Sequence, residues 1–377
     1  MPKRVVFVGL SGYHYPHTRV RCYHFRRELD RLGGIDTGLL SLKDDLAPAR
    51  TEADMYQLRD RHKLPLALRA LKKLWPEKNS LFYIQKVHYH AAAPFLLHRL
   101  GRNPFIFDYD DYDVELSNLF GRGLWNRLFF GSHKWDVITE MMARRAVCCV
   151  AASHELMDFL SPYNERVYYI PTGVDTEAFQ PAEEAHSGPV VFLWTGIIWG
   201  EPILQSLELL LEAFAEVYRV ERNILLRLIG GGNCSDQLQQ MLKHKYPGLP
   251  VETIDWLDPR EMPEQLQKAD AGCLPLAGDR VSRWLRSKSP TKMFEYMAAG
   301  LPVVSSAVGE PVHVIDSGQN GFLVNDRNEM ARAMIQLAQS EKMRRSVGMA
   351  ARRTVEKEYA LPVLGAKLHG ILDQLGW

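Results

Sequence analysis

The stretch with the clearest capacity for chemistry runs from Ser289 to Val304. It joins a helix start at Ser289 and Pro290, a carboxylate at Glu295 and a stop at Gly300 before an apolar strand. The free backbone N–H groups of a helix start attract phosphate, and a carboxylate accepts hydrogen bonds from ribose hydroxyls. The stretch therefore suits a sugar nucleotide at the mouth of an α/β sheet. Taken alone, it is equally compatible with an ordinary capped helix that carries a solvated glutamate.

An acidic segment and two histidines follow two of the expected strands. Asp108 and Asp110 come directly after a strand at residues 104–107, at the end of a sheet where ligands bind. Either carboxylate could accept a proton from a substrate hydroxyl or bind such hydroxyls. A calcium loop would need a glycine and a distal glutamate that are missing, whereas a solvated acidic loop stays an alternative. His88 and His90 have no third metal ligand nearby, so we expect polar contacts with a substrate or simple packing.

A loop with two glycines follows the first expected strand, at residues 4–8. Gly12 would let the backbone approach a phosphate or a sugar, although a plain turn explains the segment equally well. His14, Arg19 and Arg21 follow at the start of an expected helix. They are candidates for contacts with phosphate or with a second substrate.

The order of apolar strands and amphipathic helices predicts an α/β protein. A chain of 377 residues is too long for one typical core, and the pattern restarts after a polar segment at residues 181–189. We expect two Rossmann-like domains facing across a cleft, over residues 1–182 and 188–358. The last segment, residues 359–377, is expected to return to the first domain.

Composition narrows the range of partners. The net charge of +1 argues against nucleic acid, and five cysteines without metal-ligand spacing indicate a reduced, cytoplasmic protein. No apolar run approaches the ~20 residues that a membrane span needs. Two basic and aromatic stretches, at residues 59–75 and 121–135, suggest peripheral contact with the inner face of a membrane, with half-buried helices as the alternative.

Six motifs between residues 170 and 324 are Ile170–Pro181, Leu228–Gly232, Ala269–Pro275, Pro290–Val304, Gly309–Glu310 and Gly318–Val324. In type and order they resemble retaining glycosyltransferases of family four, which have the GT-B fold. The resemblance implies a nucleotide-sugar donor held mainly by the C-terminal domain, with Glu295 at the ribose hydroxyls. The donor-binding residues expected on this basis are Gly12, Gly196, Gly231, Ser289, Pro290, Thr291, Lys292 and Glu295.

The chain departs from the family pattern at two places. Ser287 stands where the family typically has a glutamate that contacts the transferred sugar. The segment Thr195–Pro202 lacks the Arg and Lys that in the family usually neutralise the leaving diphosphate. Positive charge beside that diphosphate contributes strongly to the rate of the reaction. We expect cations in the loop before the phosphate helix to compensate, with a solvated charged loop as the alternative. These cations are Arg280, Arg283, Arg286 and Lys288, and Arg283 and Lys288 are the favoured catalytic candidates.

The resemblance implies a retaining transferase that moves a hexose-type sugar from a nucleoside diphosphate, a UDP-sugar rather than a GDP-sugar, to a saccharide or lipid-linked acceptor. Synthesis of cell-surface polysaccharide or glycoconjugates is the expected setting. The departing phosphate would help to deprotonate the acceptor, so no metal ion and no cofactor besides the donor are expected. Residues expected at the acceptor are Asp108, Asp110, His14, Arg19, His88 and His90. A non-catalytic nucleotide-sugar-binding subunit and a sugar-nucleotide 2-epimerase are the alternatives.

Overall fold

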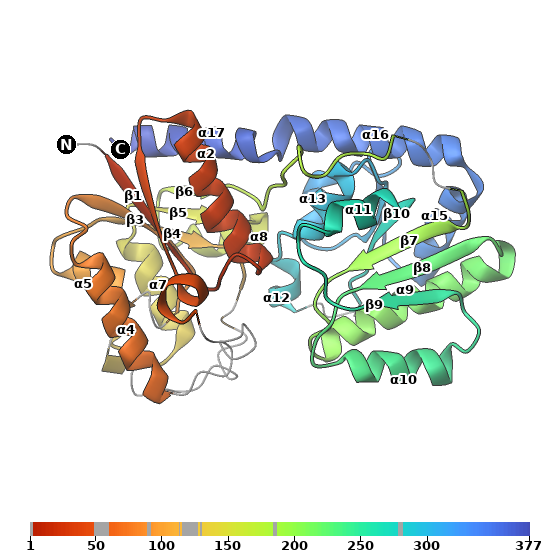
Figure 1. Cartoon of the computed structure of the whole chain (residues 1–377), viewed down its shortest axis with the longest axis horizontal. Coiled ribbons are helices and arrows are strands. Elements are labelled where there is room, and N and C mark those ends of the chain that lie inside the picture. The colour runs from red at the N-terminus through yellow and green to blue at the C-terminus, as the bar shows by residue number, and fades with distance from the viewer. Residues whose placement is uncertain are drawn as a thin grey trace. The chain divides into compact units, whose positions relative to one another are not determined.

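Two parallel sheets organise the computed structural model of the chain, one in each of its two units (Figure 1). The structure describes residues 3–48, 60–88, 92–112, 114, 127–128, 130–183, 187–277 and 282–377, with residues 60–63 described by their backbone alone. The N-terminal unit comprises Met1–Gly173, Ser287–Ser289 and Leu361–Trp377, and the C-terminal unit comprises Val174–Arg286 and Pro290–Ala360.

Apolar runs build most of the six parallel strands of the N-terminal sheet. They are β1 (Arg4–Gly9), β2 (Asp36–Ser41), β3 (Ser80–Gln85), β4 (Phe105–Tyr109), β5 (Cys148–Ala151) and β6 (Val167–Tyr169), in the order β2-β1-β3-β4-β5-β6. β3, β4 and β5 are buried along their whole length, as parallel strands covered on both faces are. The sequence predicts all of these strands except β2, whose residues Asp-Thr-Gly-Leu-Leu-Ser contain no long apolar run.

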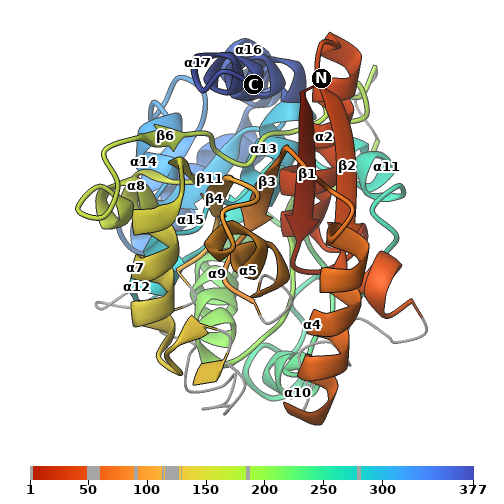
Figure 2. The ribbon, with the colours of Figure 1, turned by 90° about the vertical axis from the view of Figure 1, so that its left-hand side faces the viewer.

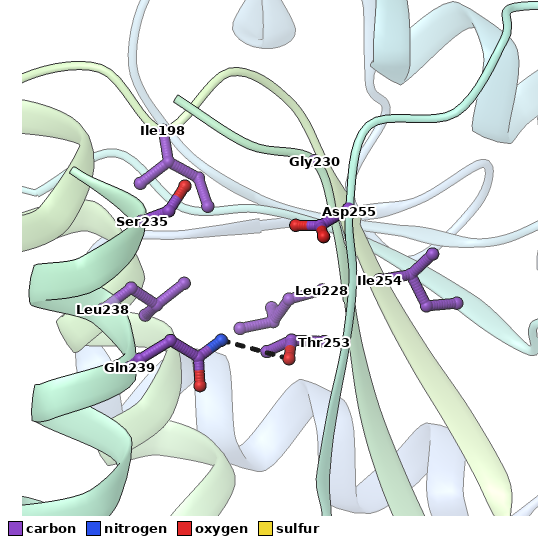
Figure 3. Close-up of a pocket in the computed structure, with 9 residues that line it drawn as sticks. All are labelled: Ile198, Leu228, Gly230, Ser235, Leu238, Gln239, Thr253, Ile254 and Asp255. Carbon is purple, nitrogen blue, oxygen red and sulfur yellow. Dashed lines mark hydrogen bonds between the residues drawn. The ribbon is translucent and has the colours of Figure 1, made fainter. Parts of the chain in front are cut away.

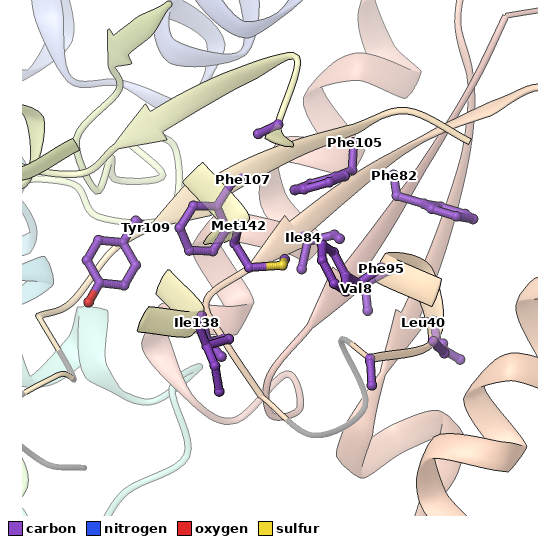
Figure 4. Close-up of a cluster of buried hydrophobic side chains, with 14 of the residues drawn as sticks. Val8, Leu40, Phe82, Ile84, Phe95, Phe105, Phe107, Tyr109, Ile138 and Met142 are labelled. Carbon is purple, nitrogen blue, oxygen red and sulfur yellow. The ribbon is translucent and has the colours of Figure 1, made fainter. Parts of the chain in front are cut away.

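Alternate side chains of these strands enter two cores on opposite faces of the sheet. On one face, Phe82 shares a core with Phe95 of a helix and Met142 of another (Figure 4). On the other face, Tyr83 shares a core with Leu368. The sheet is therefore covered by helices on both sides, as a doubly wound fold requires.

The helices of this unit are α1 (Pro16–Thr18), the π-helical turn η1 (Arg19–His24), α2 (Phe25–Leu32), the π-helical turn η2 (Leu42–Leu46), α4 (Asp60–Leu74), α5 (Ala92–Arg99), α7 (Trp135–Arg145), α8 (His154–Leu160) and α17 (Leu361–Gln374). The C-terminal helix α17 lies along α2 (Figure 1). A Cβ atom at Gly365 would lie 2.5 Å from the Cβ atom of Glu28, so glycine is what allows the two helices to come this close.

The C-terminal unit repeats the same plan. Its parallel strands are β7 (Val190–Thr195), β8 (Ile224–Ile229), β9 (Val251–Ile254), β10 (Ala271–Leu274), β11 (Val303–Ser306) and β12 (Phe322–Val324), in the order β12-β11-β10-β7-β8-β9. Its helices are α9 (Glu201–Val220), α10 (Ser235–Lys245), α11 (Met262–Gln267), α12 (Arg283–Arg286), α13 (Thr291–Ala298), α14 (Pro311–Val314), α15 (Arg327–Gln339) and α16 (Glu341–Glu358). Asp326 and Ser340 cap α15 and α16 by accepting the N–H groups of Glu329 and Met343.

In both sheets the strand order reverses between two central neighbours. The pair is β1 and β3 in the N-terminal unit (Figure 2), and β7 and β10 in the C-terminal unit. The carboxyl ends of strands at such a reversal are where open α/β sheets bind ligands. Among the helices that the structure describes, none is long and apolar enough to cross a bilayer.

Candidate active site

Glycine loops join the carboxyl ends of β7, β8 and β9 into one closely packed edge. Gly196 N donates to Ile229 O at 2.9 Å, and Ile198 N donates to Gly231 O at 3.0 Å. At Gly230 the backbone angle φ is 141°, and a Cβ atom would lie 1.8 Å from the carbonyl oxygen of Gly196. Only glycine fits this position, so the contact between the two loops depends on it.

A small pocket of about 20 Å³ lies beside this edge (Figure 3). Apolar Ile198 and Leu238 and polar Ser235, Gln239 and Asp255 are among the residues that line it. The enclosed space holds about one water molecule, so a larger ligand would lie against its rim. Apolar walls with a few polar groups suit a flat ring with polar edges, such as a nucleotide base.

The start of α13 differs from the prediction that Ser289 is its N-cap. Pro290 occupies the N-cap position, and the helix begins at Thr291. The Ser289 hydroxyl instead accepts the backbone N–H of Thr172 at 2.9 Å, within the N-terminal unit. Proline has no polar side chain and cannot cap the helix. The side chain of the N-cap residue therefore does not occupy the first N–H groups of α13, which can bind an anion.

Tyr296 holds α13 against the end of β7. The backbone N–H of Thr195 donates to the Tyr296 hydroxyl at 2.7 Å, and the two hydroxyl oxygens are 3.0 Å apart. Burial raises the pKa of Tyr296, so the phenol stays neutral. These bonds fix the helix on which Lys292 and Glu295 lie, both of them partly buried.

Lys292 brings a cation to the end of β7. Its Nζ atom is 4.2 Å from the centroid of the Trp194 ring, a distance at which an ammonium group and an indole attract each other. A Cβ atom at Gly196 would lie only 2.5 Å from the same nitrogen. Since the loop Thr195–Pro202 contains no Arg or Lys, Lys292 supplies from α13 the positive charge that the loop itself lacks.

In the N-terminal unit, a chain of hydrogen bonds crosses the reversal between β1 and β3. Thr18 Oγ1 accepts from the backbone N–H of Ser11 at 3.1 Å and donates to Gln85 Oε1 at 3.0 Å. Gln85 Nε2 donates to Asp110 Oδ2 at 2.9 Å. All four residues are buried, so this chain fixes the ends of β1, β3 and β4 relative to one another.

Two lysines and two aspartates extend this network. Lys86 Nζ lies 3.4 Å from Asp110 Oδ1 and 3.5 Å from Asp111 Oδ2, and Lys288 Nζ lies 3.3 Å from Asp111 Oδ2. Burial alone would raise the pKa of Asp111, but Lys288 and Lys86 hold that pKa below its ordinary value. The Asp111 carboxylate is therefore charged at neutral pH. We call the set Ser11, His17, Thr18, Gln85, Lys86, Asp110, Asp111 and Lys288 the N-terminal polar network; His17, Asp111 and Lys288 are partly buried and the others are buried.

Asp108 belongs to a separate ion pair in the interior of the unit. Arg21 Nε donates to Asp108 Oδ2 at 2.9 Å, and Arg21 Nη2 contacts the other carboxylate oxygen. Arg21 Nη1 also donates to the carbonyl oxygens of Ile170 and Pro171, at 2.6 and 3.2 Å. Both charged side chains are 0% exposed. Burial raises the pKa of Asp108 to about 6, and its contacts with Arg21 oppose that rise. The pair ties η1 to the ends of β4 and β6.

His17 is the titratable member of the polar network that stays neutral. Its Nε2 atom is 3.1 Å from Ser11 Oγ. Burial lowers the pKa of His17 to about 4, and the nearby Lys86 ammonium adds to this effect. The imidazole therefore stays unprotonated at neutral pH.

We expect the free energy of unfolding to fall as the pH drops from about 6.5 towards 4, because the unfolded chain then binds a proton at His17 that the folded chain does not. Between pH 7 and pH 5 this group accounts for roughly 1–2 kcal/mol. Urea unfolding at both pH values measures the difference, and His17→Gln removes it. The matched control is His14→Gln, since His14 is an exposed histidine of the same loop. An unchanged pH dependence in His17→Gln would contradict the neutral state of this imidazole.

Comparison with known proteins identifies the C-terminal part of the chain. Residues 189–340 match the sequence profile of the family described as Glycosyl transferases group 1. They run from β7 to the end of α15 and contain Lys292, Glu295 and the glycine loops.

Two curated relatives of this chain are named as mannosyltransferases. One is the MMP alpha-(1->4)-mannosyltransferase of Mycolicibacterium hassiacum, 26% identical over 64% of this chain and 58% of the relative. The other is the GDP-mannose-dependent alpha-(1-6)-phosphatidylinositol monomannoside mannosyltransferase of Mycolicibacterium smegmatis, 22% identical over 77% of this chain and 76% of the relative. Spore coat protein SA of Bacillus subtilis is 24% identical over 44% of this chain and 45% of the relative. The chain thus spans only about half the length of the first and third of these proteins.

Solved structures show the fold of the whole chain. Sucrose-phosphate synthase from Thermosynechococcus elongatus superimposes with a TM-score of 0.73 at 13% identity, over 99% of both chains. Anabaena HepE in complex with UDP and glucose gives a TM-score of 0.69 at 13% identity, over 99% of this chain and 100% of that one. At this level of identity the likeness concerns the fold alone. The chain has the GT-B fold, and the predicted fold class is confirmed; the finer assignment to family four stays a prediction.

The remaining residues predicted for donor binding or catalysis lie in both units of the chain. Gly231 belongs to the packed loop edge, and Thr291 opens α13. Arg283 lies on α12 and is partly buried. Gly12 lies against Lys43 in the N-terminal unit, where a Cβ atom would be 2.8 Å from the Cβ atom of that lysine. Their roles in donor binding or catalysis stay predictions.

The predicted acceptor residues differ in exposure. His14 is exposed, whereas Arg19 is buried and donates to the carbonyl oxygens of Tyr13 and His14 at 3.5 and 3.3 Å. His88 is also buried, and His90 lies outside the described residues. Within the part of the chain that the structure describes, no three His, Cys, Asp or Glu side chains are grouped to hold a metal ion.

Sequence reasoning missed most of the polar network. It did not predict a role for six members, although each lies near the end of β1, β3 or β4 and close to predicted candidates: Ser11, His17, Thr18, Gln85, Lys86 and Asp111. The available signal was their position after β1, β3 and β4. Using it requires knowing that these three strands are neighbours in the sheet.

Proposed function

We propose that this chain is a retaining glycosyltransferase that uses a nucleoside-diphosphate sugar. The observation that carries the proposal is the Lys292 ammonium at the end of β7, within the residues that match the glycosyl transferase family. A cation at this point can offset the charge of a departing diphosphate, which contributes strongly to such reactions. The start of α13 adds backbone N–H groups for the phosphate oxygens.

In the proposed donor complex, Glu295 accepts hydrogen bonds from the ribose hydroxyls, and the base lies against the rim of the pocket beside Gly230. We propose UDP as the nucleotide and a hexose as the sugar. The complex of HepE with UDP and glucose supports this choice. The name of the Mycolicibacterium smegmatis relative specifies GDP-mannose, so GDP-mannose is the competing donor.

The proposed reaction exchanges one bond at the anomeric carbon for another on the same face of the sugar. The bond from that carbon to the diphosphate oxygen breaks, and a bond to the acceptor oxygen forms. The acceptor proton moves to the departing phosphate, so the product keeps the anomeric configuration without a protein nucleophile or a metal ion. Lys292 offsets the charge that develops on the diphosphate, and the N-terminal polar network binds acceptor hydroxyls.

The proposed acceptor is a saccharide or a lipid-linked saccharide, in the synthesis of cell-surface polysaccharide or glycoconjugates. α4 supports a position at the inner face of a membrane. Leu68, Arg69, Lys72 and Lys73 are exposed on this helix, and Trp75 follows with 52% of its surface exposed. Apolar and basic side chains on one exposed face suit contact with anionic lipid.

A thermal-shift panel tests the donor site, with UDP, GDP, ADP and their common sugar esters, each with and without EDTA. We expect one nucleotide to raise the melting temperature selectively, because a ligand that binds only the folded state stabilises it by mass action. We expect Glu295→Ala to weaken the affinity for that nucleotide about 10- to 100-fold, since it loses hydrogen bonds to a charged acceptor. The matched control is Glu341→Ala, an exposed glutamate of the same unit.

Two results would contradict these assignments. If no nucleotide shifts the melting temperature, the proposed function fails. If Glu295→Ala binds the nucleotide as well as the unaltered chain does, the ribose site is elsewhere. A nucleotide that binds while its sugar ester is never turned over would favour a non-catalytic binding protein, an alternative that the lack of Arg and Lys in the loop Thr195–Pro202 also favours.

A further inference from the structure

Lys86 has a backbone conformation that lysine rarely adopts. Its φ angle is 59°, in the left-handed region where glycine, asparagine and aspartate are the usual residues. The residue lies directly after β3, and its N–H donates to the carbonyl oxygen of Asp108 at 2.8 Å. The sheet hydrogen bonding therefore fixes this backbone, and a strained residue that persists next to a candidate site points to a role for its side chain.

The side chain of Lys86 is 6% exposed, and its ammonium lies between two carboxylates, at 3.4 Å from Asp110 and 3.5 Å from Asp111. Both carboxylates also have another donor. Gln85 Nε2 donates to Asp110 at 2.9 Å, and Lys288 Nζ is 3.3 Å from Asp111. Each carboxylate would therefore still have a partner without Lys86. This argues against a purely structural role for Lys86.

The three aspartates of this region that the structure describes differ in the exposure of their side chains. Asp108 is 0% exposed and Asp110 is 3% exposed, whereas Asp111 is 20% exposed. An acceptor that enters from solvent therefore reaches Asp111 before the other two. The sequence predicts roles for Asp108 and Asp110, whose side chains are less exposed than that of Asp111.

We propose that Asp111 is the carboxylate that binds a hydroxyl of the acceptor, and that Lys86 is its positioning residue. The proposal rests on the proposed glycosyltransferase function and deepens its acceptor side. Asp111 accepts a hydrogen bond from an acceptor hydroxyl beside the one that attacks the sugar, and so holds the attacking oxygen towards the anomeric carbon. The attacking hydroxyl keeps its own proton for the departing phosphate. Lys86 fixes the carboxylate in the orientation that this requires. Lys288, in the segment between α12 and α13, contacts the same carboxylate.

The pH dependence of the reaction separates positioning from a merely structural role. Among the described residues, the charged and titratable groups around Asp111 are His17 from α1, Lys86 after β3, Asp110 in the same loop, and Lys288; the Arg21–Asp108 pair interacts electrostatically with Asp110. Removing the Lys86 charge takes away one of two cations that favour the ionised form of Asp111. The acidic limb of the rate profile should therefore move to higher pH by about one unit or more.

The experiment uses the full chain with methyl α-D-mannopyranoside as acceptor and with UDP-glucose or GDP-mannose as donor. We expect Asp111→Asn to lower kcat/KM for the acceptor at least about 10-fold while the nucleotide Kd stays unchanged. We expect Lys86→Met and Lys86→Asn to move the acidic limb upward, and Lys86→Arg to keep it. Asparagine suits the left-handed backbone, so the second variant guards against misfolding of the first. The matched control is Lys78→Met, an exposed lysine before the other end of β3.

Several results would overturn the proposal. Acceptor kinetics of Asp111→Asn equal to those of the unaltered chain would remove the role of that carboxylate. An unshifted profile in Lys86→Met, or equal losses in the Met and Arg variants, would make Lys86 structural, and so would a failure of both the Met and Asn variants to fold. If the unaltered chain turns over neither donor, the proposed function falls and this role falls with it; normal turnover in the unaltered chain with unaffected variants overturns this role alone.

Discussion

Lys292→Met is expected to lower kcat about 100- to 1,000-fold, the usual effect of removing one group that stabilises developing charge. The ammonium lies at the end of β7 against Trp194 and Gly196, where the loop has no cation of its own. Negative charge on the diphosphate grows as the bond to the sugar breaks, so the loss should fall on kcat more than on the affinity for the donor. Steady-state kinetics together with a nucleotide Kd measures both effects.

Two further variants make this result specific. Lys292→Arg keeps the charge and should retain part of the rate, because a guanidinium group can also bind phosphate. Lys342→Met removes an exposed lysine of α16 in the same unit and should leave kcat unchanged. Full activity in Lys292→Met would mean that this side chain only packs on Trp194. The predicted cations Arg283 or Lys288 would then be the candidates for the diphosphate.

The fold was open to prediction because buried parallel strands appear in the sequence as continuous apolar runs. β3, with the residues Ser-Leu-Phe-Tyr-Ile-Gln, and β5, with Cys-Cys-Val-Ala, are of this kind. β2 was missed because only Leu39 and Leu40 of its six residues have apolar side chains. The sequence predicts the first helix as one regular segment over about residues 20–32, but the π-helical turn η1 precedes α2, and side-chain periodicity carries no signal for such a turn.

The candidate site was predictable only where its signal is local. Pro290 and Gly300 bracket α13, so a helix with Glu295 on it followed from the sequence. The contact of Lys292 with Trp194 joins residues far apart in the chain and depends on how α13 packs on β7. The contacts of Lys86 likewise depend on packing, because its partners Asp110 and Asp111 lie directly after the neighbouring strand β4. The predicted N-cap Ser289 was wrong because its hydroxyl is engaged by Thr172, a residue more than a hundred positions away.

Asp108→Asn is expected to lower the free energy of unfolding of the N-terminal unit by about 3 kcal/mol or more. The variant leaves the Arg21 guanidinium in an interior where it is 0% exposed, without the carboxylate that balances its charge. The carbonyl oxygens of Ile170 and Pro171 can satisfy only part of its hydrogen-bonding capacity. Urea unfolding followed by circular dichroism measures the loss, and hydrogen exchange at β1, β3 and β4 assigns it to this unit.

The control is Asp36→Asn, which breaks an Arg–Asp pair on the surface of the same unit. The Asp36 side chain is 53% exposed in its pair with Arg4, so the expected cost is at most about 1 kcal/mol. The double variant Arg21→Met/Asp108→Leu removes both buried charges and should be less destabilised than Asp108→Asn, because no charge is then left without its partner. The sequence predicts a catalytic role for Asp108, and a catalytic role gives the opposite expectation, a loss of turnover without a loss of stability. If Asp108→Asn unfolds like the unaltered chain but no longer turns over donor and acceptor, Asp108 acts in catalysis and its ion pair with Arg21 is not what stabilises this unit.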